Sequence, residues 1–150
     1  MFAGLKTAKH KWDKLTEGWA GSIIYIVLGF AIALGINTAL GLALQTDTPV
    51  VAVMSDSMVP TLLRGDMVIV YKGNVSIGDI IVFDAPGYNY PIIHRVYNIT
   101  DGMIRTKGDH NPVVDPWEID LNAIHGKAGV RIPLLGWVKI GYVAAISLLR

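Results

Sequence analysis

The chain has 150 residues, a net charge of +1 and no cysteine. Without cysteine there can be no disulfide bonds, thiol catalysis or cysteine-ligated zinc, and the near-neutral charge gives no support to nucleic-acid binding. The length fits one domain plus an anchor. The apolar fraction of 52% lies slightly above the roughly 45–50% of soluble proteins, and one membrane span would account for the excess.

An uncharged apolar run extends from Trp19 to Leu44. As a helix it would be roughly 39 Å long, enough to cross a hydrocarbon core of about 30 Å. The run is too long for a signal-peptide core, and no small-x-small motif follows it, so we expect a permanent anchor. The predicted domains are a basic N-terminal tail (1–18), a transmembrane anchor (19–44), a β domain (45–132) and a C-terminal apolar segment (133–150).

Charge predicts how the anchor is oriented. Four lysines precede it, whereas no Lys or Arg follows it until Arg64; they are Lys6, Lys9, Lys11 and Lys14. The positive-inside rule therefore predicts a cytoplasmic N-terminus and places everything after Gln45 on the extracytoplasmic or lumenal side. Membrane lipid is the first expected partner, and nucleic acid is not expected.

From Pro49 onward, short β-type segments alternate with glycine- and asparagine-containing turns. Strands are predicted at 50–54, 67–71, 79–83, 92–99, 103–107 and 128–132. The predicted fold class is mainly β, with one N-terminal transmembrane helix and a small antiparallel β domain. Roughly 85 residues are enough for one β core when a membrane supports it.

The C-terminal segment is apolar but interrupted by glycine and lysine. Its longest uncharged stretch, Ile140–Leu149, is too short to span the hydrocarbon core. Trp137, Lys139 and Tyr142 are residue types that favour a membrane interface. We expect an interfacial segment, with a second membrane span as the alternative.

A hairpin is predicted around the Asp-Gly pair at 101–102, a type I′ turn sequence. Pairing outward from this turn places His94 opposite Asp109, on a mostly polar face. The other face has the composition of a core and includes Tyr97 and Thr106. The register therefore puts a carboxylate beside a candidate base, unless a bulge intervenes, because a one-residue slip reverses every side chain.

The segment Met54–Thr61 follows the anchor closely and contains Ser57 in a turn-forming context. A free serine is a weak nucleophile and needs a partner that takes its proton. His10 lies before the anchor, on the wrong side of the membrane for this purpose. The histidines that remain as candidate bases are His94, His110 and His125.

These motifs together resemble type I signal peptidase, in its histidine-type (archaeal and endoplasmic reticulum, Sec11-like) branch. The matching segments are the Ser57-Met58-x-Pro60 box, Leu63–Asp66, Ile77–Phe83, His94-Arg95, Lys107–Asn111, Asp115 and Gly126–Ala128. The resemblance covers residues 50–140. It implies a membrane-bound serine endopeptidase that removes signal peptides from exported preproteins. No cofactor and no metal are expected, and the sequence leaves open whether other secretion subunits take part.

The resemblance also implies a role for each site residue. Ser57 would attack the scissile carbonyl and His94 would act as the base, as in a Ser-His-Asp arrangement. Asp115 would be the main orienting carboxylate, whereas the hairpin register favours Asp109, so both stay candidates. The hydroxyl of Ser55 would complete an oxyanion hole with the Ser57 N–H.

Two further points follow from the resemblance. The substrate would lie extended as an added strand along Ala52, Val53, Met54, Ile92 and Ile93. Asp56 stands where the family usually has a small residue. Its carboxylate would therefore either face the developing oxyanion or point into solvent.

Three alternatives remain open. A serine–lysine protease of the self-cleaving repressor type would use Lys72 or Lys107 as its base. A metal hydrolase would need ligands from the three histidines and the aspartates, but no compact ligand spacing is present. A non-catalytic, membrane-tethered β module would only bind exported chains.

Overall fold

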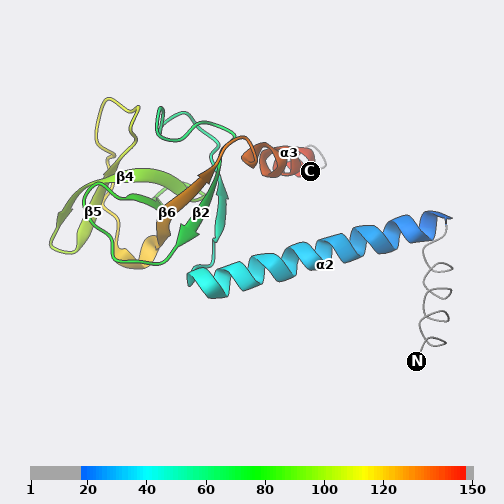
Figure 1. Ribbon diagram of the computed structural model, residues 1–150. Helices are drawn as coiled ribbons and strands as arrows, with labels where there is room; N and C mark the ends of the chain where they lie inside the picture. Colours follow the sequence, from blue (N-terminus) through cyan, green and yellow to red (C-terminus); the bar gives the residue numbers. More distant parts are fainter. Residues whose placement is uncertain (1–17, 148–150) are drawn as a thin grey trace. The chain divides into compact units, whose positions relative to one another are not determined.

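The computed structural model describes residues 18–147 of the chain (Figure 1). A long helix, α2 (Gly18–Leu44), is followed by six strands and two further helical elements. The strands are β1 (Val50–Ala52), β2 (Met67–Tyr71), β3 (Ile80–Phe83), β4 (Ile92–Thr100), β5 (Met103–Lys107) and β6 (Ile124–Ile132). The other helices are η1 (Leu121–Ala123) and α3 (Gly136–Ser147).

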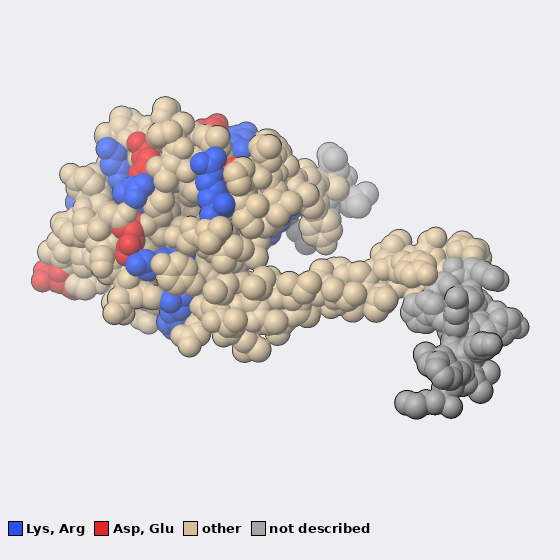
Figure 2. Space-filling view, in the orientation of Figure 1, with Lys and Arg blue, Asp and Glu red and all other residues tan. Residues whose placement is uncertain are grey.

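Helix α2 is long and apolar enough to cross a membrane. It contains no charged residue, and its surface in Figure 2 is accordingly uniform, whereas Lys, Arg, Asp and Glu are spread over the β domain. Its apolar side chains, such as Ile26 and Phe30, are exposed. A surface of this kind is stable in lipid rather than in water. The lysines on which the predicted orientation rests lie outside the described residues.

The six strands form one antiparallel sheet in the order β1-β2-β6-β3-β4-β5. Strand β3 is central and is buried on both faces. Ile81 and Phe83 pack in one core cluster, and Val82 packs in the other. Because successive strand residues point to opposite faces, this double burial explains why β3 is an unbroken apolar run.

The predicted fold class is therefore confirmed: an N-terminal apolar helix and an antiparallel β domain. All six strands occur near their predicted positions. The main difference is β6, which begins at Ile124 instead of Ala128 because its first residues pair with β3 and its later residues with β2. Gly126 and Lys127 interrupt the apolar alternation there, so the pattern alone did not show the strand.

The β4–β5 hairpin begins as predicted. Asp101 and Gly102 both have positive φ, of 52° and 79°, as a type I′ turn requires. The first pairs across the turn, Thr100 with Met103 and Ile99 with Ile104, also follow the predicted register.

The predicted register is wrong beyond Asn98, because Tyr97 forms a β-bulge. The slip places Val96 opposite Thr106 and Arg95 opposite Lys107. Val96 is consequently 1% exposed and Tyr97 57% exposed, the reverse of their predicted faces. The bulge stabilises the sheet because it buries the apolar Val96 and leaves the hydroxyl of Tyr97 in solvent.

Helix α3 is attached to the serine-bearing side of the domain. A Cβ on Gly65, whose φ is +89°, would lie 2.0 Å from the indole nitrogen of Trp137, so this close packing needs glycine. The Lys139 Nζ donates to the Val50 carbonyl at 2.9 Å. With 12 described residues, α3 is about 18 Å long. Its interfacial position, and the alternative of a second span, stay predictions.

Candidate active site

The loop between β1 and β2 presents Ser57. Two backbone hydrogen bonds of 2.9 Å close the loop at its base, from Val53 N to the Asp66 carbonyl and from Gly65 N to the Val53 carbonyl. Met58 is fully buried in a core cluster and anchors the middle of the loop. The preceding residue, Ser57, is therefore held half-buried at the surface.

A hydrogen-bonded relay connects Ser57, His94 and Asp115. The Ser57 Oγ lies 3.1 Å from His94 Nε2, and His94 Nδ1 lies 2.6 Å from Asp115 Oδ2. His94 is 6% and Asp115 8% exposed. A carboxylate at Nδ1 selects the tautomer that carries its proton there, which leaves Nε2 free to accept the serine proton. Chemically, this arrangement can activate a serine for attack on a carbonyl.

Asp115 is held in turn by Thr106, a residue of the predicted core face. The Thr106 Oγ1 donates to Asp115 Oδ2 at 2.6 Å, and the Asp115 N donates to the Thr106 carbonyl at 2.9 Å. Thr106 is completely buried. The sequence does contain a signal for this contact. Thr106 follows Ile104 on the strand face that is predicted to be buried, and a buried hydroxyl requires a hydrogen-bond partner.

Asp109 is hydrogen-bonded to Arg95 and Thr61 instead of His94, and its predicted position opposite His94 is wrong because the bulge at Tyr97 shifts the register. Its carboxylate instead forms a bidentate pair with Arg95, at 2.8 Å from Nε and 2.6 Å from Nη2. The Thr61 Oγ1 donates to the same carboxylate at 2.5 Å. The hydrogen bonds from Arg95 lower the pKa of Asp109, and the carboxylate in turn raises the pKa of Arg95.

The turn that follows β5 supports the serine through its backbone. The His110 N donates to the Ser57 carbonyl at 2.8 Å, while the His110 side chain is exposed. A Cβ on Gly108 would lie 2.7 Å from the same carbonyl, so glycine permits the close approach. His110 thus meets Ser57 through its main chain, and His94 meets it through its ring.

The residues beside the serine are open to solvent. Ser55 Oγ lies 3.0 Å from Ser57 Oγ, and Ser55 is exposed. The side chain of Asp56 is 63% exposed, with its carboxylate 3.8 Å from Arg64 Nε. Of the two orientations considered for Asp56, this exposure fits the one toward solvent.

The predicted substrate-binding residues fall into three environments. Ala52 belongs to β1, an edge strand of the sheet, and Met54 just beyond it is exposed. Val53 and Ile93 are buried in the same core cluster. Ile92 is half-buried and pairs with Phe83 of β3. Val53 and Ile93 thus share a core cluster that also contains Met58 of the serine loop.

The groups required by the other mechanisms lie elsewhere. Lys107 lies opposite Arg95, and Lys72 is exposed after the end of β2. His125 pairs with Asp84, with its Nε2 3.0 Å from the carboxylate. Within residues 18–147, no group of three or more His, Asp or Glu side chains could hold a metal ion. Among the candidate bases within residues 18–147, His94 is the one hydrogen-bonded to the Ser57 hydroxyl.

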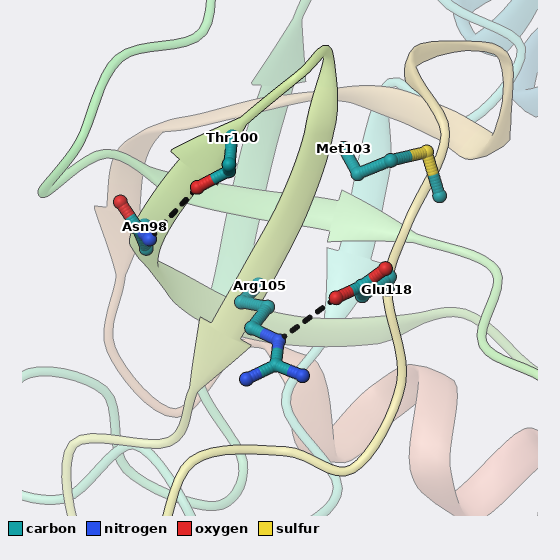
Figure 3. A pocket seen from close by; sticks show the side chains of 5 residues that line it. All are labelled: Asn98, Thr100, Met103, Arg105 and Glu118. Atoms are coloured by element: carbon teal, nitrogen blue, oxygen red, sulfur yellow. Dashed lines mark hydrogen bonds and ion pairs between the residues drawn. The ribbon is translucent and has the colours of Figure 1, made fainter.

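A cavity of about 220 Å³ lies at the far end of the β4–β5 hairpin (Figure 3). It is lined by Asn98, Thr100, Met103, Arg105 and Glu118. Its polar groups already bond to one another: Asn98 donates to Thr100 at 3.0 Å, and Arg105 to Glu118 at 3.1 Å. The cavity contains no residue of the Ser57 relay.

Residues 21–129 match a protein-family model described as Peptidase S24-like. The signal peptidase complex catalytic subunit sec11 of Dictyostelium discoideum is 36% identical over 135 residues, which cover 81% of this chain and 75% of that protein. The subunit of the same name from Scheffersomyces stipitis is 36% identical over 133 residues, covering 79% and 78%. That of Neurospora crassa is 34% identical over 118 residues, covering 67% and 68%.

Proposed function

The chain belongs to the peptidase S24-like family, and from that premise we propose that it is a membrane-bound serine endopeptidase that removes signal peptides from exported preproteins. One observation supports the chemistry above all. Ser57 Oγ lies 3.1 Å from His94 Nε2, and the opposite ring nitrogen lies 2.6 Å from Asp115. The names of the relatives support the substrate class, because they are catalytic subunits of signal peptidase complexes.

In the proposed reaction, Ser57 Oγ attacks the scissile carbonyl while His94 Nε2 takes the hydroxyl proton. Asp115 stabilises the imidazolium that forms. The imidazolium then gives its proton to the leaving amine, which departs as the new N-terminus of the mature protein. Water, activated by the same ring, cleaves the acyl-enzyme and restores the free serine.

The developing oxyanion would be bound by the Ser57 N–H and the Ser55 hydroxyl. The position of Ser55 supports this role, since its oxygen lies 3.0 Å from the attacking oxygen. A donor of this kind contributes about 3 kcal/mol to transition-state stabilisation. Asp109 would act differently from Asp115. Together with Arg95 it braces the serine loop through Thr61, and it takes no part in proton transfer.

The substrate would bind as an extended strand along the edge strand β1, between Ala52–Met54 and Ile92–Ile93. A free strand edge supplies backbone donors and acceptors for such an addition. Small apolar pockets beside Ala52 and Ile93 would then select small side chains before the cleavage site.

The enzyme would be anchored by α2, with its N-terminus in the cytoplasm and the β domain on the extracytoplasmic or lumenal side. The lysines that precede the anchor support this orientation. Helix α3 would lie at the membrane interface. The relatives are named as subunits of a complex, so further subunits are candidate partners.

The test of this function is cleavage of a preprotein by the purified chain in detergent or vesicles. Ser57→Ala should abolish cleavage, while Ser76→Ala, an exposed serine in a neighbouring loop, should leave it intact. Excess chelator should not reduce the wild-type rate. Full activity of Ser57→Ala would exclude the serine-protease mechanism. If a chelator abolished the wild-type activity and zinc restored it, the result would favour the metal hydrolase.

The topology is tested separately. Protease added outside sealed cells or spheroplasts should digest the β domain and leave an N-terminal tag protected. A protected β domain would place Ser57 on the cytoplasmic side and contradict the proposal.

A further inference from the structure

One oxygen of Asp115 accepts two short hydrogen bonds. His94 Nδ1 and Thr106 Oγ1 both lie 2.6 Å from Asp115 Oδ2. Asp115 and Thr106 are also joined through the backbone, because the Asp115 N donates to the Thr106 carbonyl at 2.9 Å. The mechanism described above uses the first of these bonds and assigns nothing to Thr106.

We propose that Thr106 is a positioning residue of the site, and that its hydroxyl sets the orientation in which Asp115 meets His94. This inference rests on the proposed function. Thr106 reaches neither Ser57 nor the substrate strand, so it acts on the reaction through Asp115 alone.

The physical argument begins with burial. Asp115 is 8% exposed and Thr106 is fully buried, so the bond between them is largely shielded from water. Hydrogen bonds to an ionised acceptor are about twice as strong as neutral ones. Two donors from different elements fix the rotation of the carboxylate, whereas a single donor leaves it free to turn. A turned carboxylate would no longer select the His94 tautomer that accepts the serine proton.

The hydroxyl is the only part of Thr106 that this role requires. Its backbone carbonyl would accept from Asp115 N whatever side chain stood there. Valine has nearly the same shape as threonine and lacks the donor, while serine keeps the donor and lacks the methyl group. The two substitutions therefore separate the hydrogen bond from the packing.

The experiment measures kcat and KM for preprotein cleavage by Thr106→Val and Thr106→Ser. Thr106→Val should lower kcat by roughly tenfold or more, about the value of one hydrogen bond to a charged group, with KM unchanged. Thr106→Ser should restore most of the rate. If Thr106→Val does not fold, Thr106→Ala takes its place. An unchanged kcat in the hydroxyl-free variant, or no rescue by serine, would overturn the inference.

Val96→Ala is the matched control, because Val96 lies directly opposite Thr106 and is similarly buried, but its side chain has no hydrogen-bond donor. It should cost stability and leave kcat close to wild type. An equal fall in kcat in Val96→Ala and Thr106→Val would mean that packing, and not the hydroxyl, matters.

Proton NMR gives a readout that does not depend on proteolysis. The resonance of the Nδ1 proton between His94 and Asp115 should shift or broaden in Thr106→Val and return in Thr106→Ser. An unchanged resonance in Thr106→Val would contradict the inference. If the wild type cleaves no preprotein, the proposed function fails, and this measurement still decides the role of Thr106.

Discussion

His94 and Arg95 are neighbours in β4, yet they enter two different arrangements because successive strand residues point to opposite faces. His94 is buried and connects Ser57 to Asp115. Arg95 has a side chain 36% exposed and pairs with Asp109, which also accepts from Thr61. Both carboxylates come from the same short segment after β5, six residues apart.

The difference separates a chemical role from a mechanical one. In the proposed mechanism the buried set supplies the nucleophile, the base and the orienting carboxylate, and hydrogen bonds join them in that order. The half-exposed set links the serine loop, β4 and the segment after β5, and the Arg95 Nη1 also donates to the Gly78 carbonyl at 2.7 Å. Changes in the first set should therefore appear in the rate, and changes in the second mainly in stability.

The largest expected effect comes from removing the base. His94→Ala should lose all measurable cleavage while keeping its fold, because within residues 18–147 the basic nitrogen hydrogen-bonded to the Ser57 hydroxyl is that of His94. The measurement is the preprotein cleavage rate, with circular dichroism as the check on folding. Lys107→Ala and Lys72→Ala are the controls and should retain most activity. A dead Lys107→Ala beside an active His94→Ala would make lysine the base.

A smaller effect is expected from breaking the Arg95 brace. Arg95→Ala leaves the Asp109 carboxylate without its bidentate partner, and should lower the free energy of unfolding by about 1–2 kcal/mol, given partial solvent exposure. For a domain of this size, that corresponds to several degrees in Tm. Thermal unfolding in detergent measures it. A large loss of kcat with unchanged Tm would contradict the distinction between the two sets.

The smallest expected effect is a change in stability with pH. The pKa of Asp109 is lowered in the folded protein, chiefly by Arg95, so its contribution is complete above the unfolded value of about 3.9 and is lost as pH falls through the folded value. Asp79, whose pKa is lowered mainly by Lys127, contributes with the same sign. The Tm should therefore fall on acidification below about pH 4, and less steeply in Asp109→Asn. An identical slope in both proteins would contradict this account.

The sequence predicted the helix, the strands and the turn at 101–102 because these features depend on local patterns. The resemblance also indicated Ser57 and His94, whose side chains lie within hydrogen-bond distance in the structure, and their catalytic roles stay predictions. The hairpin register held from Thr100 to Asn98 and then failed at Tyr97, because a bulge depends on how both sheet faces pack and leaves no local signature.

For the same reason, local sequence patterns could not predict that Asp115 is the hydrogen-bond partner of His94. Asp115 lies 21 residues along the chain from His94, in an irregular segment whose path no periodicity constrains. The resemblance indicated Asp115 where the register indicated Asp109. The brace made by Thr61 and Arg95 was missed for the same reason, since it joins a loop to a strand 34 residues away.

The most direct test compares Asp115→Asn with Asp109→Asn in one cleavage assay, with Tm measured on the same samples. Asp115→Asn should lose as much as 10⁴-fold in kcat, because an amide can hold the imidazole in the wrong tautomer, and its Tm should also fall because the bonds from His94 and Thr106 lose a charged acceptor. Asp109→Asn should stay within about tenfold of the wild-type rate while its Tm falls, since it weakens one charged hydrogen-bonded pair. Equal losses of kcat, or a greater loss in Asp109→Asn, would contradict the assignment of the buried relay as the catalytic set.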